Sequence, residues 1–357
     1  MPLFMDLHKA ADYEVKPTVE EIKRNHIADL QVQQKYGVKF LQYWINEEAG
    51  LVFCLMEGPD KESCIAVHQE AHGNMPCNVV ELQGGDYAGF MGAHNKVNKF
   101  DIVENTDGTF DTGYRVMLVM DCISLSPADD TPATIDELIE KSGGRVVTKP
   151  GRRDVVVFMS ATRAIDCALN IIQAVKQSGQ SIEVSIGISA GEPVTTQKEF
   201  FGNTIHLANN LCTIARNGQV IVSAFVKQMA GERSFHSYQD NPVLKVLNKE
   251  DEQFLNQLME ETSSRVYQPT LAIGELSKNL GMSRSGLYRK IISVTGLSAN
   301  TFIRETRLRK ALQLMKEKYG NVNEVSLEAG FNNTSYFTKS FQKRFGILPV
   351  QVLKSGT

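Results

Sequence analysis

The N-terminal segment of the chain concentrates side chains that could bind a transition metal. Four of the seven histidines lie there: His8, His26, His68 and His72. Since His68 and His72 are four residues apart, both imidazoles share one face of a helix and could chelate one ion. Imidazole with a thiolate or carboxylate, as Cys54 and Glu57 offer, suits Ni, Zn, Cu or Co rather than Mg or Ca. The alternative interpretation is that the two helix histidines are solvated and that Cys54 is a core cysteine.

The apolar pattern around these residues predicts a ferredoxin-like βαββαβ domain over residues 1–83. The expected strands are 3–8, 38–46, 51–57 and 79–82, and the expected helices are 18–36 and 60–72. Both helices of this arrangement cover the same face of the sheet, so His26 on the first helix could approach His68 and His72 on the second. His8 ends the first strand, and Cys54 and Glu57 lie on the third.

This segment resembles a small ferredoxin-like family that includes a nickel-responsive protein. The shared features are the opening Pro2–Asp6, an aromatic second strand with Tyr43 and Trp44, and a second helix that carries His68 and His72. The resemblance implies a transition-metal cofactor, with nickel as the expected ion and the two helix histidines as its first candidate ligands.

The C-terminal segment contains one helix-turn-helix pattern twice. In each copy a short helix with apolar periodicity stops at a glycine (Gly281 or Gly330), a capping Ser or Asn follows, and a second helix begins. Leu287 and Ile291 give the first of these second helices a buried face. The corresponding stripe in the other unit is Phe337, Phe341 and Phe345. A connecting helix over 302–315 could separate the units by the distance between successive major grooves, about 34 Å.

The opposite faces of the two second helices carry the candidate DNA contacts. Short polar side chains with one Arg or Lys suit base edges in a major groove. The candidates are Ser285, Tyr288 and Arg289 in the first unit, and Asn333, Thr334, Ser335 and Lys339 in the second. Lys343 and Arg344 are placed for phosphates. From Arg265 onward 15 Lys and Arg oppose 5 Asp and Glu, a net charge of +10 in a chain of −3, which is typical of a nucleic-acid-binding module.

Residues 263–357 resemble the AraC/XylS family of bacterial transcription regulators. Its signature is matched by Gly330, Phe331, Ser335, Tyr336, Phe337, Phe341, Gly346 and Pro349. The resemblance implies a bipartite module that binds double-stranded DNA and commonly contacts RNA polymerase. Gly286 is unusual, because glycine weakens a helix by roughly 1 kcal/mol relative to alanine.

A second α/β pattern, predicted for residues 114–232, resembles the class III nucleotide cyclase homology domain. The matching segments are Gly143–Val147, Ser185–Pro193 and Phe201–Ser223.

Active cyclases need two carboxylates to hold two divalent ions. Asp121 matches the first carboxylate, but Arg152 stands where the second belongs. His206 and Asn210 replace the residues that stabilise the transition state, and Asn203 stands where the base-contacting residue falls. The resemblance therefore implies a catalytically dead domain that dimerises, with a small-molecule or nucleotide ligand left open. A shift of register that makes Asp154 the second carboxylate is the alternative.

The chain is therefore predicted to be an α+β multidomain protein. A linker over 84–113 joins the first two domains, and 233–262, with an apolar helical face, joins the central domain to an all-α C-terminal domain. No run of eighteen apolar residues and no signal-peptide pattern is present. Six cysteines without paired spacing favour a reducing compartment. These features predict a cytoplasmic protein without membrane contact.

Three functions follow from these patterns. The first is a homodimeric DNA-binding transcription regulator, not an enzyme, that responds to nickel or a similar ion. The second is an active nucleotide cyclase under DNA or metal control. The third is a constitutive DNA-binding scaffold.

Overall fold

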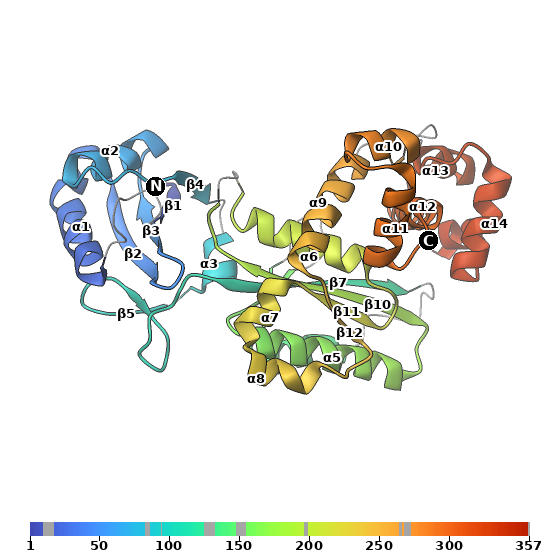
Figure 1. Ribbon diagram of the computed structural model, residues 1–357, viewed down its shortest axis with the longest axis horizontal. Helices are drawn as coiled ribbons and strands as arrows, with labels where there is room; N and C mark the ends of the chain where they lie inside the picture. The colour runs from blue at the N-terminus through green and yellow to red at the C-terminus, as the bar shows by residue number, and fades with distance from the viewer. Residues whose placement is uncertain are drawn as a thin grey trace.

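The computed structural model describes residues 1–9, 18–82, 86–93, 95–124, 133–147, 155–195, 199–263, 266–267 and 273–355. Three folded parts follow one another along the longest axis of the molecule (Figure 1). The N-terminal part is blue, the central part runs from green to yellow, and the C-terminal part is orange and red. The expected α+β multidomain class is confirmed.

The N-terminal part is an antiparallel sheet with strand order β2-β3-β1-β4, and α1 and α2 cover one face of it. Its elements are β1 (Leu3–Lys9), α1 (Val19–Val32), the 3-10 helix η2 (Gln33–Tyr36), β2 (Lys39–Asn46), β3 (Leu51–Glu57), α2 (Lys61–Ala71) and β4 (Asn78–Leu82). A capping box of Thr18 and Glu21 begins α1, and the Asp60 side chain caps α2. This is the predicted βαββαβ arrangement.

The segment 84–113, expected to be a linker, is packed rather than extended. It contains α3 (Asp86–Met91), β5 (Lys96–Val97) and β6 (Val103–Glu104). Phe90 and Ile102 are fully buried, and the Tyr43 backbone N–H donates to the Asp101 carbonyl at 3.0 Å. The apolar residues Phe90, Met91, Ile102 and Val103 outweigh the Gly, Asn and Asp content of this segment, because each of these four completes a neighbouring core.

The central part is a mixed sheet with strand order β12-β11-β10-β7-β9-β8. Its elements are β7 (Arg115–Ser124), α4 (Ala133–Lys141), β8 (Arg145–Val147), β9 (Val155–Phe158), α5 (Ala161–Ser178), β10 (Ile182–Gly191), α6 (Gly202–Ile214), β11 (Gln219–Val222), α7 (Ala224–Ala230), α8 (Glu232–Phe235), the 3-10 helix η3 (His236–Tyr238) and β12 (Leu244–Val246). Alternation along β7 sends Val116 and Leu118 toward α4, α5 and α7, and Met117 and Val119 toward α6.

Gly187 on β10 allows α6 to lie directly on the sheet. A Cβ at this position would come within 2.2 Å of the Ala208 carbonyl oxygen and 2.3 Å of the Cys212 amide nitrogen. No side chain fits such an approach, so glycine fixes the distance between this strand and helix.

The C-terminal part is all-helical. Its elements are α9 (Lys249–Ser263), α10 (Ile273–Asn279), α11 (Arg284–Thr295), α12 (Ala299–Lys316), α13 (Val322–Glu328), α14 (Thr334–Phe345) and α15 (Pro349–Ser355). The pairs α10–α11 and α13–α14 are the two predicted helix-turn-helix units, and α12 is the predicted connecting helix. Among the described helices, none has the length and apolar character needed to cross a membrane.

A buried ion pair fixes the junction between the N-terminal and central parts. The Arg115 guanidinium has no exposed surface and donates to both carboxylate oxygens of Asp111, at 2.9 and 2.8 Å. It also donates to the carbonyls of Phe90 and Met91, and the Trp44 indole N–H donates to Asp111 at 3.3 Å. Residues of β2, α3 and β7 therefore converge on one ion pair.

We expect Asp111→Ala to destabilise the protein by about 3–5 kcal/mol, because it leaves Arg115 charged and buried without its partner. The free energy of unfolding in a urea titration measures the change. The matched control is Glu137→Ala, which removes the exposed i, i+4 pair with Lys141 and is expected to cost about 1 kcal/mol or less. Equal effects of the two substitutions would contradict this role of the buried pair.

Candidate metal centre and nucleic-acid interface

His68 on α2 lies at the centre of a buried cluster of side chains that could hold a metal ion. Its Nε2 is 2.8 Å from Asp6 Oδ2, and its Nδ1 is 3.1 Å from Asp29 Oδ1. Only about 1% of the His68 side chain is exposed. Because the two ring nitrogens face two different carboxylates, one imidazole belongs to two adjacent groups of donor atoms.

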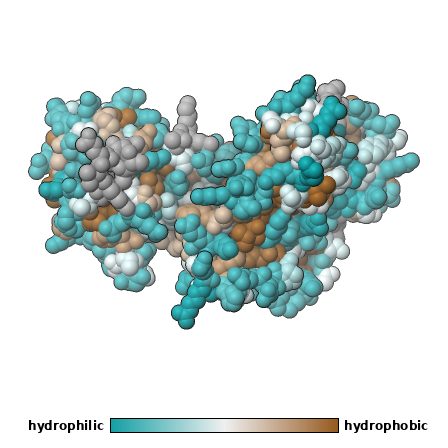
Figure 2. Space-filling model, viewed as in Figure 1, coloured by the Kyte–Doolittle hydropathy of each residue, from teal (hydrophilic) through white to brown (hydrophobic). Residues whose placement is uncertain are grey.

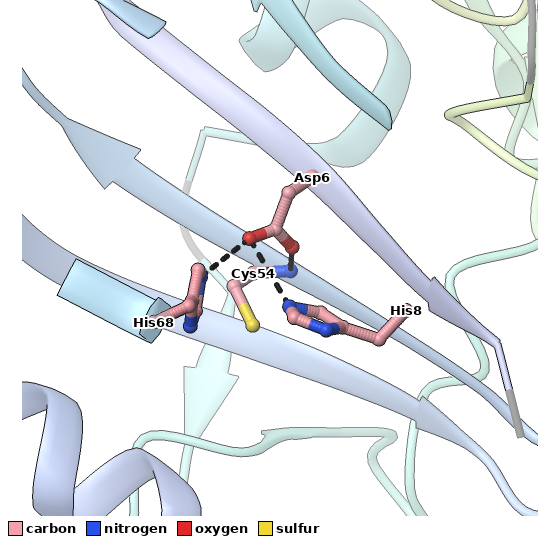
Figure 3. A group of neighbouring side chains, drawn as sticks. All are labelled: Asp6, His8, Cys54 and His68. Atoms are coloured by element: carbon pink, nitrogen blue, oxygen red, sulfur yellow. Dashed lines mark hydrogen bonds and ion pairs between the residues drawn. The ribbon is translucent and has the colours of Figure 1, made fainter. Parts of the chain in front are cut away.

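The first group consists of Asp6, His8, Cys54 and His68, whose donor atoms all lie within 4.8 Å of one another. Figure 3 shows the Cys54 sulfur between the two imidazoles, with Asp6 above them. Asp6 and His8 are two residues apart on β1, so alternation directs both to the same face of the sheet. Nitrogen, oxygen and sulfur donors in one site suit borderline ions such as Ni²⁺, Zn²⁺ or Co²⁺.

The second group consists of Asp29, His68 and His72, and it meets the same distance criterion. His72 Nε2 lies 3.2 Å from Asp29 Oδ1 and 3.4 Å from His68 Nδ1. The i, i+4 spacing of the two histidines therefore brings their rings together, as the sequence predicts, and α1 supplies the carboxylate between them.

Charge within the cluster favours protonated imidazole and ionised carboxylate when no metal is present. Burial disfavours the charged form of Asp6, but contacts with His8 and His68 outweigh it and hold its pKa far below the ordinary range. Burial raises the pKa of the Cys54 thiol well above its ordinary value, and the charge of Asp6 adds to this. A metal ion would therefore displace protons from His68 and Cys54 as it binds.

The other predicted ligands lie at different distances from the cluster. His26 borders the same cavity, of about 190 Å³, but its Nε2 is 3.2 Å from Asp101 Oδ2. Within the described residues, Glu57 belongs to neither donor group, because it is three residues from Cys54 on β3 and so points to the opposite face. The sequence prediction omitted Asp6 and Asp29, although the i, i+2 spacing of Asp6 and His8 on one strand was a usable signal.

Helix α11, the predicted recognition helix of the first unit, exposes two of the three side chains that are predicted to contact DNA. Ser285 and Arg289 are exposed, whereas Tyr288 is half-buried and packs against the core of its own unit. Ser283 caps the helix by accepting a hydrogen bond from the Gly286 amide at 3.1 Å. The N-terminal half of α11 therefore offers short polar and cationic side chains to solvent.

The second recognition helix, α14, is partly committed to contacts within the protein. Ser335, Lys339 and Lys343 are exposed. The Asn333 side chain caps the helix through the Tyr336 amide at 2.8 Å, and the Thr334 hydroxyl donates to Asn323 at 2.7 Å.

On the face shown in Figure 2 the C-terminal part is mostly hydrophilic, and apolar side chains gather over the central part.

The position of the Arg344 side chain differs from the expectation that it faces DNA phosphates. Its guanidinium is half-buried and binds Glu183 on β10 through both terminal nitrogens, at 2.8 and 2.7 Å, while its Nε binds Glu305 on α12 at 2.7 Å. Two carboxylates satisfy the fork of this side chain, so it is not available to DNA in this structure. The sequence did not show which domain would lie beside α14.

The residues singled out by the cyclase resemblance also lie near the C-terminal part. Asp121 Oδ2 accepts a hydrogen bond from Arg309 of α12 at 2.9 Å. Asn203, His206 and Asn210 line an open cleft of about 790 Å³ between α6 and α9. The other two positions, 152 and 154, lie outside the described residues.

Two family models match the two ends of the chain. Residues 4–82 match a model described as "Nickel responsive protein SCO4226-like", and residues 276–355 match a model described as "Helix-turn-helix domain". The transcriptional regulator MtrA of Neisseria gonorrhoeae is 37% identical over 75 residues, which cover 21% of this chain and 25% of MtrA.

The C-terminal domain is of the AraC type. The curated relatives extend well beyond the similar segment, since the chain covers between 7% and 38% of their length.

Solved structures resemble the other two domains. SCO4226 of Streptomyces coelicolor A3(2) is 32% identical, with 22% of this chain and 94% of that chain covered and a TM-score of 0.21. An adenylate/guanylate cyclase/hydrolase from Silicibacter pomeroyi is 26% identical, with 34% and 81% covered and a TM-score of 0.29.

The ionisation of His68 determines how the free energy of unfolding of the metal-free protein should depend on pH. Burial opposes protonation of His68, but hydrogen bonds to Asp29 and Asp6 outweigh it and raise its pKa from 6.5 to about 10. A histidine with a raised folded pKa contributes its full stabilisation below the unfolded pKa, and the contribution is lost as pH rises toward the folded value. The free energy of unfolding should therefore fall above pH 6.5, by up to about 1.4 kcal/mol per pH unit.

Urea titrations in the presence of a chelator, across that pH range, measure this slope. We expect a flatter profile for His68→Gln, which cannot titrate. Parallel profiles for the wild type and the variant would contradict the assignment.

We expect two kinds of effect on DNA binding when exposed residues of α11 and α14 are substituted. Arg289→Ala and Lys339→Ala should each relax specificity at their own base positions, at a cost of about 1–3 kcal/mol for the preferred base. Lys343→Ala should weaken binding to all sequences alike. Competition binding against a set of single-base variants of the bound duplex distinguishes the two. A uniform effect of Arg289→Ala or Lys339→Ala would refute a base contact at that residue.

Proposed function

We propose that this chain is a DNA-binding transcription regulator that responds to a transition metal, with nickel as the expected ion. The observation that carries the proposal is the pair of helix-turn-helix units on α10–α11 and α13–α14, each with exposed polar and cationic side chains. The match of residues 276–355 to a helix-turn-helix family supports it. Double-stranded DNA is the partner, and an AraC-type domain makes RNA polymerase a second one.

The N-terminal domain is the proposed sensor. Its match to a nickel-responsive family and its buried N, O and S donors both support a metal ion there. Asp6, His8, Cys54 and His68 would hold one ion, and Asp29 and His72 extend the donor set. A divalent cation would replace the proton on His68 as the positive partner of Asp6 and Asp29. Its binding would therefore change the contacts among β1, β3, α1 and α2.

The central domain is proposed to serve as a connector without catalytic activity. Arg309 holds Asp121 through its guanidinium, so a cation from the same chain stands where a metal ion would be needed. A homodimer through this domain, in the cytoplasm, completes the proposal. Its interface would have to differ from the α6 face, because α9 packs there.

Fluorescence anisotropy with duplex DNA from the region upstream of its own gene tests the sensor. Saturating Ni²⁺ should change the dissociation constant of the full chain by about 5- to 150-fold, the usual range of allosteric coupling. His68→Ala should abolish the response but retain DNA binding. The matched control is His236→Ala, which changes an exposed histidine outside the cluster and should respond like the wild type.

Each alternative function has a distinct result in these assays. DNA binding that is identical with and without Ni²⁺, by a protein that also lacks stoichiometric metal, would favour a constitutive scaffold. Cyclic product from ATP or GTP with Mn²⁺, lost in Asp121→Ala, would show an active cyclase.

A further inference from the structure

A chain of alternating charges connects the central sheet to the second helix-turn-helix unit. In order, its members are Asp121, Arg309, Glu305, Arg344 and Glu183. Arg309 binds Asp121 at 2.9 Å and Glu305 at 3.4 Å. Arg344 binds Glu305 at 2.7 Å and Glu183 at 2.7 Å. The outer two carboxylates belong to the central sheet, and the three inner groups belong to the C-terminal domain.

The sheet places its two carboxylates side by side. β7 and β10 are antiparallel neighbours in which Asp121 pairs with Ser185, and Glu183 pairs with Ile123. Arg344 lies in the last turn of the recognition helix α14. The ion pair with Glu183 therefore links a DNA-binding helix directly to a strand of another domain.

The two helix-turn-helix units are attached to the central domain in different ways. The first unit shares an apolar core with it, to which α6 contributes Leu211 and Ile214, and α9 contributes Phe254, Leu255 and Leu258. In addition, Lys245 and Arg216 of the central domain donate to carbonyls at the C-terminal end of α11, at 2.8 Å each. This attachment buries apolar area and satisfies the helix end.

The second unit has a much smaller apolar attachment. In the cluster that contains its core, Ile123 is the residue that comes from the central sheet. An open cleft of about 550 Å³, lined by Asp121, Thr306, Arg309 and Lys310 among others, runs along this boundary. Relative motion of domains is expected unless their interface is large and hydrophobic, so the attachment of the second unit can open more readily than that of the first.

We propose that Arg344 is a phosphate-binding side chain held in reserve, and that Glu183 keeps it and helix α14 against the central domain until the contact opens. The inference rests on the proposed function. A guanidinium fork fits a phosphate as well as it fits a carboxylate, and the neighbouring Lys343 on α14 is already exposed. When the ion pair with Glu183 breaks, both terminal nitrogens of Arg344 become available to a phosphate, while Glu305 still binds Nε.

The number of phosphates that the protein contacts gives a direct readout. The logarithm of the binding constant falls with the logarithm of salt concentration, with a slope of about −0.9 for each neutralised phosphate. We expect Glu183→Gln to bind a labelled duplex of random sequence more tightly than the wild type, and to steepen the slope by about 0.9. The Glu137→Gln variant removes one negative charge from α4 instead and should leave the slope unchanged.

A double-mutant experiment tests whether Arg344 causes the steeper salt slope of Glu183→Gln. In the wild-type chain, Arg344→Ala should leave the salt slope unchanged, because the side chain is engaged by Glu183. In the Glu183→Gln chain, the same substitution should remove the added slope. Lys343→Ala should reduce the slope in both backgrounds, and thermal unfolding of each variant checks that it is folded.

The outcomes separate the failure of this inference from the failure of the proposed function. A less negative salt slope for Arg344→Ala in the wild-type chain, or no change in slope for Glu183→Gln, would overturn the reserve role of Arg344. The proposed function would stand in either case, because the protein would still bind DNA. Absence of binding by both the wild type and Glu183→Gln at low salt would overturn the proposed function, and the inference with it.

Discussion

The apolar core shared by α6, α9 and α11 determines how the C-terminal domain is presented. Leu255 and Leu258 of α9 are fully buried in one cluster with Leu211 of α6 and Ile291 of α11. Burial of this kind stabilises by roughly 25 cal/mol per Å² and, unlike an ion pair, is not screened by salt. The first helix-turn-helix unit is therefore packed on the central domain through an apolar core, whereas the second is attached mainly through charged groups. The relative position of the two recognition helices then depends on the weaker of these attachments.

The candidate metal centre and this interface are connected by contiguous contacts, which begin at Tyr43, a residue that lines the same cavity as His68 and Cys54. Trp44 follows Tyr43 on β2, and its indole N–H reaches Asp111, which binds Arg115 at the start of β7. The same strand reaches Asp121, the partner of Arg309 on α12. Contiguity alone does not establish energetic coupling, which also requires an element with two arrangements. In our proposal the charged attachment of α14 is such an element, because at this boundary the central sheet contributes Ile123 to the apolar cluster and opening would expose little apolar surface beyond that residue.

Patterns that are local in sequence predicted most of the fold. The period of apolar residues, the capping Ser or Asn of the helix-turn-helix units, and the glycines that end helices predicted the βαββαβ domain and both helix-turn-helix units. The assignment of 84–113 as a linker stays a prediction, but the Gly and Asn content of this segment concealed Phe90 and Ile102, which fill neighbouring cores. The short helix α7 and strand β12 were not predicted, since each is too brief to establish a period.

The sequence predicted the site less completely than the fold. Spacing on one helix was enough to bring His68 and His72 together, but the carboxylates Asp6 and Asp29 come from two other elements. Their contribution depends on how α1 and β1 pack, which no local pattern specifies. Arg344 shows the same limit: its charge and helix position indicated a DNA contact, but the carboxylate that engages it lies 161 residues away.

Hydrogen exchange of the full chain with and without Ni²⁺ tests the central claim most directly. The account predicts that the ion protects amides of α1, α2 and β1 and also changes exchange in α12 and α14, while α11 stays as it was. Protection that is confined to the N-terminal domain, at saturating metal, would contradict it.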